Sequence, residues 1–508
     1  IIGALYQLKK EKKDFVVVLM LFILTGVAIV YYLNQYPHQP RERDYAYAGS
    51  FYAFSIWIGF SVLAISQYLR KIFKPMGGSI LTALILLIVP LQMASENWDD
   101  HDRSGRYTTR DFASNYLNSC RPNAILFTNG DNDTFPLWYA QEVEGIRTDV
   151  RVANFSYLRA GWYVEQMMRK AYESEPFPMT HTVDQMKRGV RDVVPISNQI
   201  KDRVSVKKVI NFVASEDERT RIPSPFDRNK KVNYIPTKNY KLEIDSSDII
   251  SKGVIGEEYH SRIENQLSWS IGRNYLLKDG LTVMDLMASF DWNRPIHFAI
   301  TVGSNKHFNL SDYMLVEGLS YYLSPVKARE EGQIGEVNTD RMYDIMMNKF
   351  KWGGIEDTDI YLDEDNRRML ANFRNSYSRL ARSLIREEKN DSARKVMDYC
   401  MNKITNEKIS YGFAMVTYVD NYFRIGDTEK AKEYMKVLRE NLNQEMDYYT
   451  GLGEFTPQFT DDIRRNMYVI RRLSEIAQRF GEEELYKEIV DDFNRHVDNL
   501  EQSSKILN

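Results

Sequence analysis

The chain has 508 residues, enough for two or three domains rather than one. Its 67 Lys and Arg residues nearly balance its 70 Asp and Glu residues, so the net charge is −3. Proteins that bind nucleic acid carry a basic excess on one face, and this balance therefore argues against nucleic acid as a partner. The chain begins with Ile1 rather than Met, and we expect it to be a fragment or a processed product.

Three uncharged apolar runs lie near the N-terminus, at 15–33, 51–69 and 77–95. Each has about 19 residues, enough to cross a bilayer core of roughly 30 Å. Buried helices of a soluble core are the alternative, but aromatic residues at the ends of the runs, such as Tyr31 and Tyr68, favour membrane spans. We expect residues 1–96 to form three transmembrane helices, the third kinked near Pro90.

The distribution of basic residues predicts how these spans are oriented. Four lysines between residues 9 and 13 precede the first span, and Arg70, Lys71 and Lys74 separate the second from the third. Both clusters should be cytoplasmic by the positive-inside rule. Residues 34–50 and everything after Ser95 then lie outside, which in a Gram-negative cell is the periplasm. The prediction is a multi-pass protein of the bacterial inner membrane with a periplasmic C-terminal part.

The segment 97–360 has the pattern of an α/β domain. A helix at 107–117 comes first, followed by a short strand at 125–127, a helix at 136–143 and a strand at 150–155. A β-α-β unit of this kind favours a parallel sheet. Further helices are predicted at 161–172, 204–212 and 281–290, a further strand at 295–303, and a long loop or insertion at 214–242.

The segment 361–508 consists of charged amphipathic helices. Residues 390–395 and 427–432 resemble each other, and each lies between two helical runs. Their separation is roughly 38 residues, near the 34 of a tetratricopeptide repeat. We favour a helical domain similar to such repeats over the alternative, an ordinary helical bundle.

The two cysteines, Cys120 and Cys400, are too few for a disulfide scaffold and have no metal-binding spacing. A single bridge between them is one alternative, and two isolated, partly buried thiols are the one we favour.

The outer loop between the first two spans is the first candidate site. It contains Arg41, Glu42, Arg43, Asp44 and Tyr45 at the membrane surface, where a lipid phosphate would lie. Guanidinium groups bind phosphate through two parallel hydrogen bonds. If the loop is extended, the two arginines point one way and the two acids the other. The alternative is a solvated turn whose charges pair with one another.

A second candidate is Asp131 with Asp133, directly after the strand at 125–127. Ligand sites in α/β sheets lie at such strand ends, and the two carboxylates could hold a divalent cation. The more frequent role of so short a pattern is to cap a turn or helix. Residues 99–102, with three acids and a histidine, are a weaker candidate and fit a solvated junction better. His297 lies in an apolar strand and should be a core residue.

Three stretches, 40–60, 123–153 and 290–300, resemble a bacterial membrane family of unknown function that is related to protein O-mannosyltransferases. Members are typically about twice as long, and their N-terminal membrane half is similar to glycosyltransferases that use lipid-phosphate sugars. The resemblance implies a polyprenyl-phosphate sugar donor and a periplasmic protein or glycan acceptor. It also implies that the catalytic acid precedes this chain, so the catalytic residues here are unknown. A non-enzymatic, membrane-anchored periplasmic scaffold is the alternative.

The predicted topology can be tested with alkaline phosphatase fusions, which are active only outside the cytoplasm. We expect no activity for fusions at Gly3 and Phe73 and full activity for a fusion at Asn508. An active fusion at Phe73, or an inactive one at Asn508, would contradict the orientation.

Overall fold

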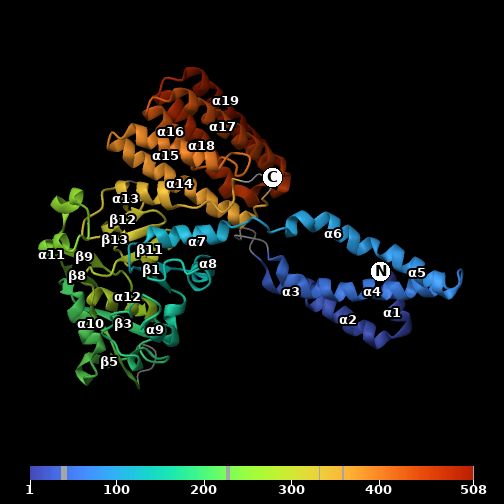
Figure 1. The fold of residues 1–508 in the computed structure, drawn as a ribbon, viewed down its shortest axis with the longest axis horizontal. Helices are drawn as coiled ribbons and strands as arrows, with labels where there is room; N and C mark the ends of the chain where they lie inside the picture. The colour runs from blue at the N-terminus through green and yellow to red at the C-terminus, as the bar shows by residue number, and fades with distance from the viewer. Residues whose placement is uncertain (36–42, 225–228, 331, 357–359, 507–508) are drawn as a thin grey trace. The chain divides into compact units, whose positions relative to one another are not determined.

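The computed structural model of the chain describes residues 1–35, 43–224, 229–330, 332–356 and 360–506 (Figure 1). The chain divides into two compact units. The first comprises Ile1–Arg106, Asp357–Arg368 and Leu452–Thr460, and the second comprises Tyr107–Glu356, Met369–Gly451 and Asp461–Asn508.

The first unit contains the predicted spans. Its helices are α1 (Ile2–Lys10), α2 (Lys12–Leu24), α3 (Val27–Leu33), α4 (Ala48–Leu69), α5 (Pro75–Leu86) and α6 (Ile88–His101). Three stretches are long and apolar enough to cross a membrane: Lys12–Leu33, Asp44–Leu69 and Pro75–Trp98. The three apolar runs are therefore helices of membrane-spanning length, as the sequence predicts.

The third span is interrupted close to Pro90. Helix α5 ends at Leu86 and α6 begins at Ile88. Pro90 has no N–H to donate to the carbonyl of Leu86, and its ring crowds the preceding turn, so the regular helix breaks there. This interruption agrees with the kink predicted for the third span.

Helix α1, which the sequence did not predict, packs against α4. The Trp57 indole donates a hydrogen bond of 2.9 Å to the Gln7 side chain, and both side chains are buried. A Cβ on Gly3 would lie 1.7 Å from the carbonyl oxygen of Trp57, so only glycine permits this approach of the two helices. The lysine-rich segment before the first span is thereby held to the second.

The second unit is built on a six-stranded mixed sheet with the order β14-β12-β13-β11-β1-β2. Its strands are β1 (Ile125–Thr128), β2 (Arg151–Asn154), β11 (Ile296–Ala299), β12 (Met314–Glu317), β13 (Ser320–Leu323) and β14 (Glu336–Val337). Strand β1 pairs in parallel with β2 and with β11, whereas β13 is antiparallel to β11 and β12. The predicted β-α-β unit is confirmed, with α8 (Asp131–Glu142) as its crossover.

Stacked aromatic rings fill the core beneath this sheet. Phe127 lies 5.0 Å from Phe155 and 5.3 Å from Phe298, measured between ring centres. Each ring comes from a different strand or strand end, so the three neighbouring elements are held by one cluster. The helices beside the sheet are α7 (Thr108–Ser119), α9 (Gly161–Met167), α12 (Lys278–Ala288) and α13 (Thr339–Asp344), the last continued by a π-helical turn, Ile345–Lys349.

Several predicted boundaries were wrong. The strand predicted at 295–303 ends at Ala299, the helix predicted at 161–172 ends at Met167, and α8 begins five residues before the predicted 136–143. In α8, Asp131 and Asp133 occupy the first turn, where carboxylates favour helix formation through the helix dipole. Both carboxylates therefore belong to the helix itself.

Of the two alternatives predicted for 214–242, a long loop or an insertion, the loop was wrong. Its described residues form short strands that pair with neighbouring segments. The smaller sheets contain β3 (Val193–Ile200), β4 (Val204–Ser205), β5 (Arg221–Pro223), β6 (Lys231–Asn233), β7 (Ile235–Thr237), β8 (Asn239–Glu243), β9 (Gln266–Ser270) and β10 (Tyr275–Leu277). The short helices α10 (Val206–Ala214) and α11 (Ser246–Ser251) complete this part. Polar side chains on such short strands give too little alternation to be recognised from sequence.

The remaining helices are α14 (Glu364–Arg386), α15 (Asn390–Lys403), α16 (Met415–Arg424), α17 (Thr428–Gly451), α18 (Thr460–Arg479) and α19 (Glu483–Ile506). Three of them end in the same way. Glu388, Gly426 and Gly481 each have a positive φ and are the second residue after the end of α14, α16 and α18, respectively. In each case the next residue's N–H bonds back to the fifth residue before it, the pattern of a Schellman cap.

These three caps turn the chain into α15, α17 and α19, so the region consists of helical hairpins with one repeated turn. The resemblance between 390–395 and 427–432 is explained, because each segment lies at the start of a helix, α15 and α17 respectively. The likeness to tetratricopeptide repeats in particular stays a prediction.

Both cysteines are free and buried. Burial raises the pKa of Cys120 and of Cys400 to about 12. The bridge considered from the sequence is absent, and two separate thiols are confirmed.

The buried side chain of Arg374 should be important for the stability of the hairpins. Its terminal nitrogens donate to the carbonyls of Ile404, Thr405, Ile409 and Ser410, which hold the loop after α15. We expect Arg374→Ala to lower the free energy of unfolding by about 3–5 kcal/mol, because it leaves buried carbonyls unpaired. Urea unfolding followed by circular dichroism measures this. Arg424→Ala, which removes a half-exposed ion pair with Asp420, should cost less than about 1 kcal/mol.

Candidate functional site

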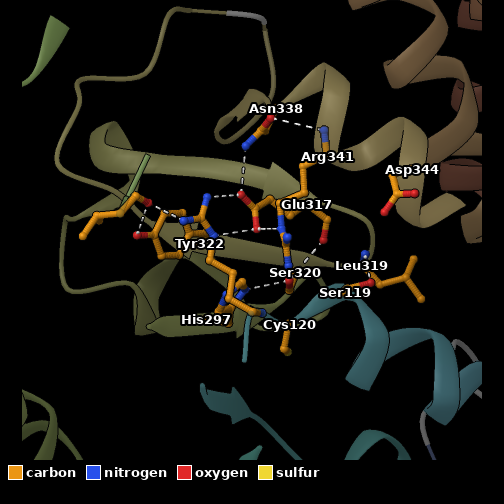
Figure 2. Close-up of polar contacts among 12 residues, drawn as sticks. Ser119, Cys120, His297, Glu317, Leu319, Ser320, Tyr322, Asn338, Arg341 and Asp344 are labelled. Atoms are coloured by element: carbon orange, nitrogen blue, oxygen red, sulfur yellow. Dashed lines mark hydrogen bonds and ion pairs between the residues drawn. The ribbon is translucent and has the colours of Figure 1, made fainter. Parts of the chain in front are cut away.

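The candidate site is built around Glu317, the last residue of β12, whose side chain is fully buried (Figure 2). Gly318 follows with a φ of 61°, a left-handed conformation that glycine adopts without strain. A Cβ on Gly318 would lie 2.2 Å from the Ser119 hydroxyl, which accepts a hydrogen bond of 2.9 Å from the Leu319 N–H. The turn after Glu317 is therefore fixed against the end of α7.

Arg121, just after α7, grips this carboxylate with two hydrogen bonds. Its Nε lies 3.1 Å from Oε2 of Glu317 and its Nη2 lies 2.6 Å from Oε1. The third nitrogen donates to the carbonyl of Val254. The guanidinium also lies 3.7 Å from the centre of the Tyr322 ring, a cation–π contact. Arg121 thus joins the α7 corner, the sheet and the segment before Ile255.

A second arginine reaches the same carboxylate from α13. Asn338 caps this helix and donates 3.0 Å to Oε1 of Glu317, while Arg341 Nε donates 2.6 Å to Oε2. Figure 2 shows Asn338 and Arg341 on the same side of Glu317. In the part of the chain that the structure describes, the two terminal amino groups of Arg341 make no hydrogen bond. They are available to a ligand.

The charges of this network decide the protonation of Glu317. Burial alone would raise the pKa of Glu317, but Arg121 and Arg341 outweigh it and hold the pKa at about 2. The carboxylate is therefore ionised throughout the physiological range. Two arginines around one carboxylate leave a local excess of one positive charge.

His297 lies beneath the network and is fully buried. Its Nδ1 lies 2.9 Å from the Ser320 hydroxyl, and its Nε2 accepts from the backbone N–H of Arg121 at 3.3 Å. Burial lowers the pKa of His297 to about 3, so the ring is neutral at pH 7. Because Ser320 is equally buried, this serine–histidine pair cannot meet a substrate, and the predicted core role of His297 is confirmed.

A cavity of about 710 Å³ opens beside the network. Its wall includes Arg121, Tyr322, Asn338 and Arg341, together with Lys252, Glu258, Trp292, Asn293, Asp340 and Asp344. Trp292 is nearly buried and has a φ of 66°, an unusual conformation for a bulky residue and one that clusters at functional sites. The stretch 290–300, one of the three that carry the family resemblance, begins at this wall.

The lining suits a polar ligand with both donors and acceptors. Arg341 and Lys252 supply positive charge, and Glu258, Asp340 and Asp344 supply negative charge. Within the described residues no group of three or more His, Cys, Asp and Glu side chains could hold a metal ion, at this cavity or elsewhere. The cavity can therefore bind and orient a ligand through hydrogen bonds and ion pairs.

The structure places Asp131 and Asp133 at the opposite end of β1, on the first turn of α8. Asp131 is exposed and accepts 3.2 Å from the Tyr157 hydroxyl. Asp133 accepts from the Thr301 hydroxyl, and burial raises its pKa although that hydrogen bond opposes the shift. The two carboxylates have different partners and point to different neighbours. A shared divalent cation stays a prediction.

Of the outer-loop candidates, Arg41 and Glu42 lie outside the described residues. Arg43 precedes a 3₁₀ helix, Asp44–Tyr47, that leads into α4, so Asp44 and Tyr45 are helical and not extended. The alternation of side chains expected for an extended loop therefore fails over these residues. Of the stretch 99–102, residues 99–101 form the end of α6, and Asp102 follows that helix and accepts a hydrogen bond of 2.8 Å from the Ser104 N–H.

Sequence reasoning missed Glu317, Arg121 and Arg341. The one available signal is Glu317 itself, a charged residue that closes the apolar run of β12. A buried carboxylate requires cationic partners. Arg121 lies 196 residues before Glu317 and Arg341 lies 24 residues after it, and no helical or strand period in the sequence links either arginine to Glu317.

We expect Glu317→Gln to destabilise the second unit by about 3–5 kcal/mol, because two arginines lose their buried counter-charge. The destabilised unit should unfold more often and so expose Cys120, which is next to Arg121. In a Cys400→Ala background, a thiol reagent should therefore label Cys120 faster in the Glu317→Gln variant than in the parent. Glu258→Gln, at an exposed carboxylate of the same cavity, is the matched control and should label as the parent does.

The ion pairs of Glu317 with the two arginines also predict that the stability of the protein depends on pH. The folded-state pKa of Glu317 lies below its ordinary value of 4.5, so its stabilisation is complete above that value and is lost as the pH falls toward 2. The difference in melting temperature between the parent and Glu317→Gln should be constant above about pH 5.5 and narrow below pH 4.5. A gap that does not change with pH would contradict an ionised Glu317.

Comparison with known proteins gives one match. No curated protein and no solved structure matches the chain. A family model described as TMEM260-associated domain 2 matches residues 109–341. The matched range begins in α7, contains all six strands of the main sheet and ends at Arg341, so it includes the whole Glu317 network. This part of the chain is similar to TMEM260-associated domain 2.

Proposed function

We propose that the chain is the C-terminal part of a membrane-bound, glycosyltransferase-like protein. In this proposal sugar passes from a polyprenyl-phosphate donor to a protein or glycan acceptor outside the cytoplasm. The observation that carries it is the joining, in one chain, of three helices of membrane-spanning length to a domain similar to TMEM260-associated domain 2. Two of the three stretches that carry the resemblance to a family related to protein O-mannosyltransferases, 123–153 and 290–300, lie within the matched range 109–341.

The two units have different tasks in this proposal. A lipid-linked donor lies in the membrane, so its phosphate is met by groups at the ends of the spans. Arg43 stands just before α4, and Arg70 is the residue after that helix ends. These arginines are therefore at opposite ends of one span, and a donor on the outer surface meets only Arg43. The cavity beside Glu317 then binds the acceptor or a part of it.

A second candidate function is a membrane-anchored scaffold without enzymatic activity. The three helical hairpins with one repeated cap favour it, since stacked hairpins form extended surfaces that bind partner proteins. The partner would be a periplasmic protein. Deletion of the gene followed by glycan profiling of the exported proteins separates the two functions. Loss of a glycan supports the transferase, and an unchanged glycan profile supports the scaffold.

The donor contact can be tested at Arg43, with Arg41 beside it. A charge-assisted hydrogen bond to phosphate contributes about 1.5–3 kcal/mol, so Arg43→Ala should weaken donor use by about one to two decades. Arg43→Lys keeps the charge without the planar fork and should be intermediate. The measurement is sugar transfer in membranes that contain the full-length protein, at several donor concentrations.

Arg70→Ala is the matched control, because it removes the same charge at the other end of α4. Its donor dependence should equal that of the unmodified protein. Unchanged donor dependence in Arg41→Ala and Arg43→Ala, with normal amounts of protein in the membrane, would exclude a phosphate contact at this loop.

A further inference from the structure

We infer that a cluster of four aromatic rings on the α/β domain binds a neutral sugar ring of a glycan. This aromatic platform consists of Phe135 and Trp138 on α8 and Tyr157 and Trp162 after β2. It lies apart from the cavity beside Glu317, which is at the other end of β1. The inference goes beyond the transferase proposal, because such a site would hold a glycan in an enzyme and in a scaffold alike.

The four rings are contiguous. Ring centres of Phe135 and Trp138 are 5.6 Å apart, those of Trp138 and Tyr157 6.0 Å, and those of Tyr157 and Trp162 6.4 Å. The planes of Trp138 and Tyr157 differ by only 16°. Tyr163 is buried beneath them and contacts three of the four rings. The platform is therefore supported from below by a residue of the core.

The two outer rings of the platform are open to solvent, and the two inner rings, Trp138 and Tyr157, are half-buried. Trp162 is 62% exposed and Phe135 is 48% exposed. Single exposed apolar side chains are common on soluble proteins, whereas contiguous groups of them mark binding sites. In the part of the chain that the structure describes, the indole N–H groups of Trp138 and Trp162 donate to no protein atom. Two hydrogen-bond donors are thus free at the rings.

Acceptors stand at the rim of the same rings. The Tyr157 hydroxyl donates to one oxygen of Asp131, at 3.2 Å, and among the described residues that is the only hydrogen bond to the Asp131 side chain. Its second oxygen can accept from a ligand. Asp131 follows β1 and Tyr157 follows β2, and the carboxyl ends of adjacent parallel strands are where α/β sheets bind ligands.

A neutral sugar matches this combination. One face of a pyranose ring consists of C–H groups, which are attracted to the negative face of an aromatic ring, and its edge carries hydroxyl groups. The indole N–H groups and the Asp131 carboxylate would pair with those hydroxyls. A membrane surface fits less well, because interfacial segments present unpaired Lys and Arg beside their aromatic rings. Here the Asp131 carboxylate borders the rings, and Arg159, between Tyr157 and Trp162 in the chain, is paired with Asp279 at 3.5 Å.

The test is binding of neutral oligosaccharides to the complete chain in lipid nanodiscs, so that no sugar-headed detergent competes. The probes are mannotetraose, cellotetraose and chitotetraose, followed by tryptophan fluorescence and calorimetry. We expect saturable binding of at least one of them. Trp162→Ala should weaken it about tenfold, because a free energy of about 1.4 kcal/mol corresponds to that factor. Trp162→Phe keeps a ring and should be intermediate, and Asp131→Asn should weaken binding less.

Tyr448→Ala is the matched control, since Tyr448 is an equally exposed ring on α17 of the same unit. Binding should not change in it. Failure of all three sugars to bind, or equal binding by Trp162→Ala, would overturn the inference. So would quenching by brominated lipid that decreases when Trp162 is replaced by Phe, which would identify the platform as a membrane contact; Trp57 and Trp98, in the predicted spans, contribute equally to both proteins. None of these readouts requires sugar transfer, so the transferase proposal can fail while this site stands.

Discussion

The pairing of Glu317 with Arg121 and Arg341 is the interaction on which the second unit depends. The three residues come from the corner after α7, the end of β12 and the first turn of α13. A buried carboxylate with two arginines is strongly stabilised only while both remain, so the loss of any member leaves an uncompensated charge in the interior. The helix, the sheet and the helix after it are thereby held in one arrangement.

This network also shapes the cavity next to it. Arg121 and Asn338 donate hydrogen bonds to Glu317 and to neighbouring protein groups, so their side chains hold fixed positions in the cavity wall. Arg341 is different, because it lines the cavity and, among the described residues, only its Nε of the guanidinium nitrogens makes a hydrogen bond. A ligand would therefore meet the incompletely bonded guanidinium of Arg341 beside residues that the Glu317 network already holds in place. Such preorganisation lowers the entropy lost on binding.

The sequence correctly predicts the features that depend on residues close together in the chain. The spans are recognisable because a bilayer excludes charge over a whole helix, and the β1-α8-β2 unit because its strand residues are apolar and close together. The Arg121–Glu317 and Asp133–Thr301 contacts are not recognisable, because they join segments 196 and 168 residues apart in the chain. The Tyr157–Trp162 rings were missed for another reason: exposed aromatic residues follow no helical or strand period.

The position of the two thiols has a consequence for how the chain is made. Cys120 and Cys400 are each buried, and a raised pKa keeps them in the unreactive thiol form. In a folded molecule neither can reach an oxidant. An unfolded chain exposes both, and in an oxidising compartment a bridge between them would join α7 to α15 across most of the second unit. Folding therefore protects the protein from this non-native disulfide. Molecules that fold slowly would be the ones that acquire it.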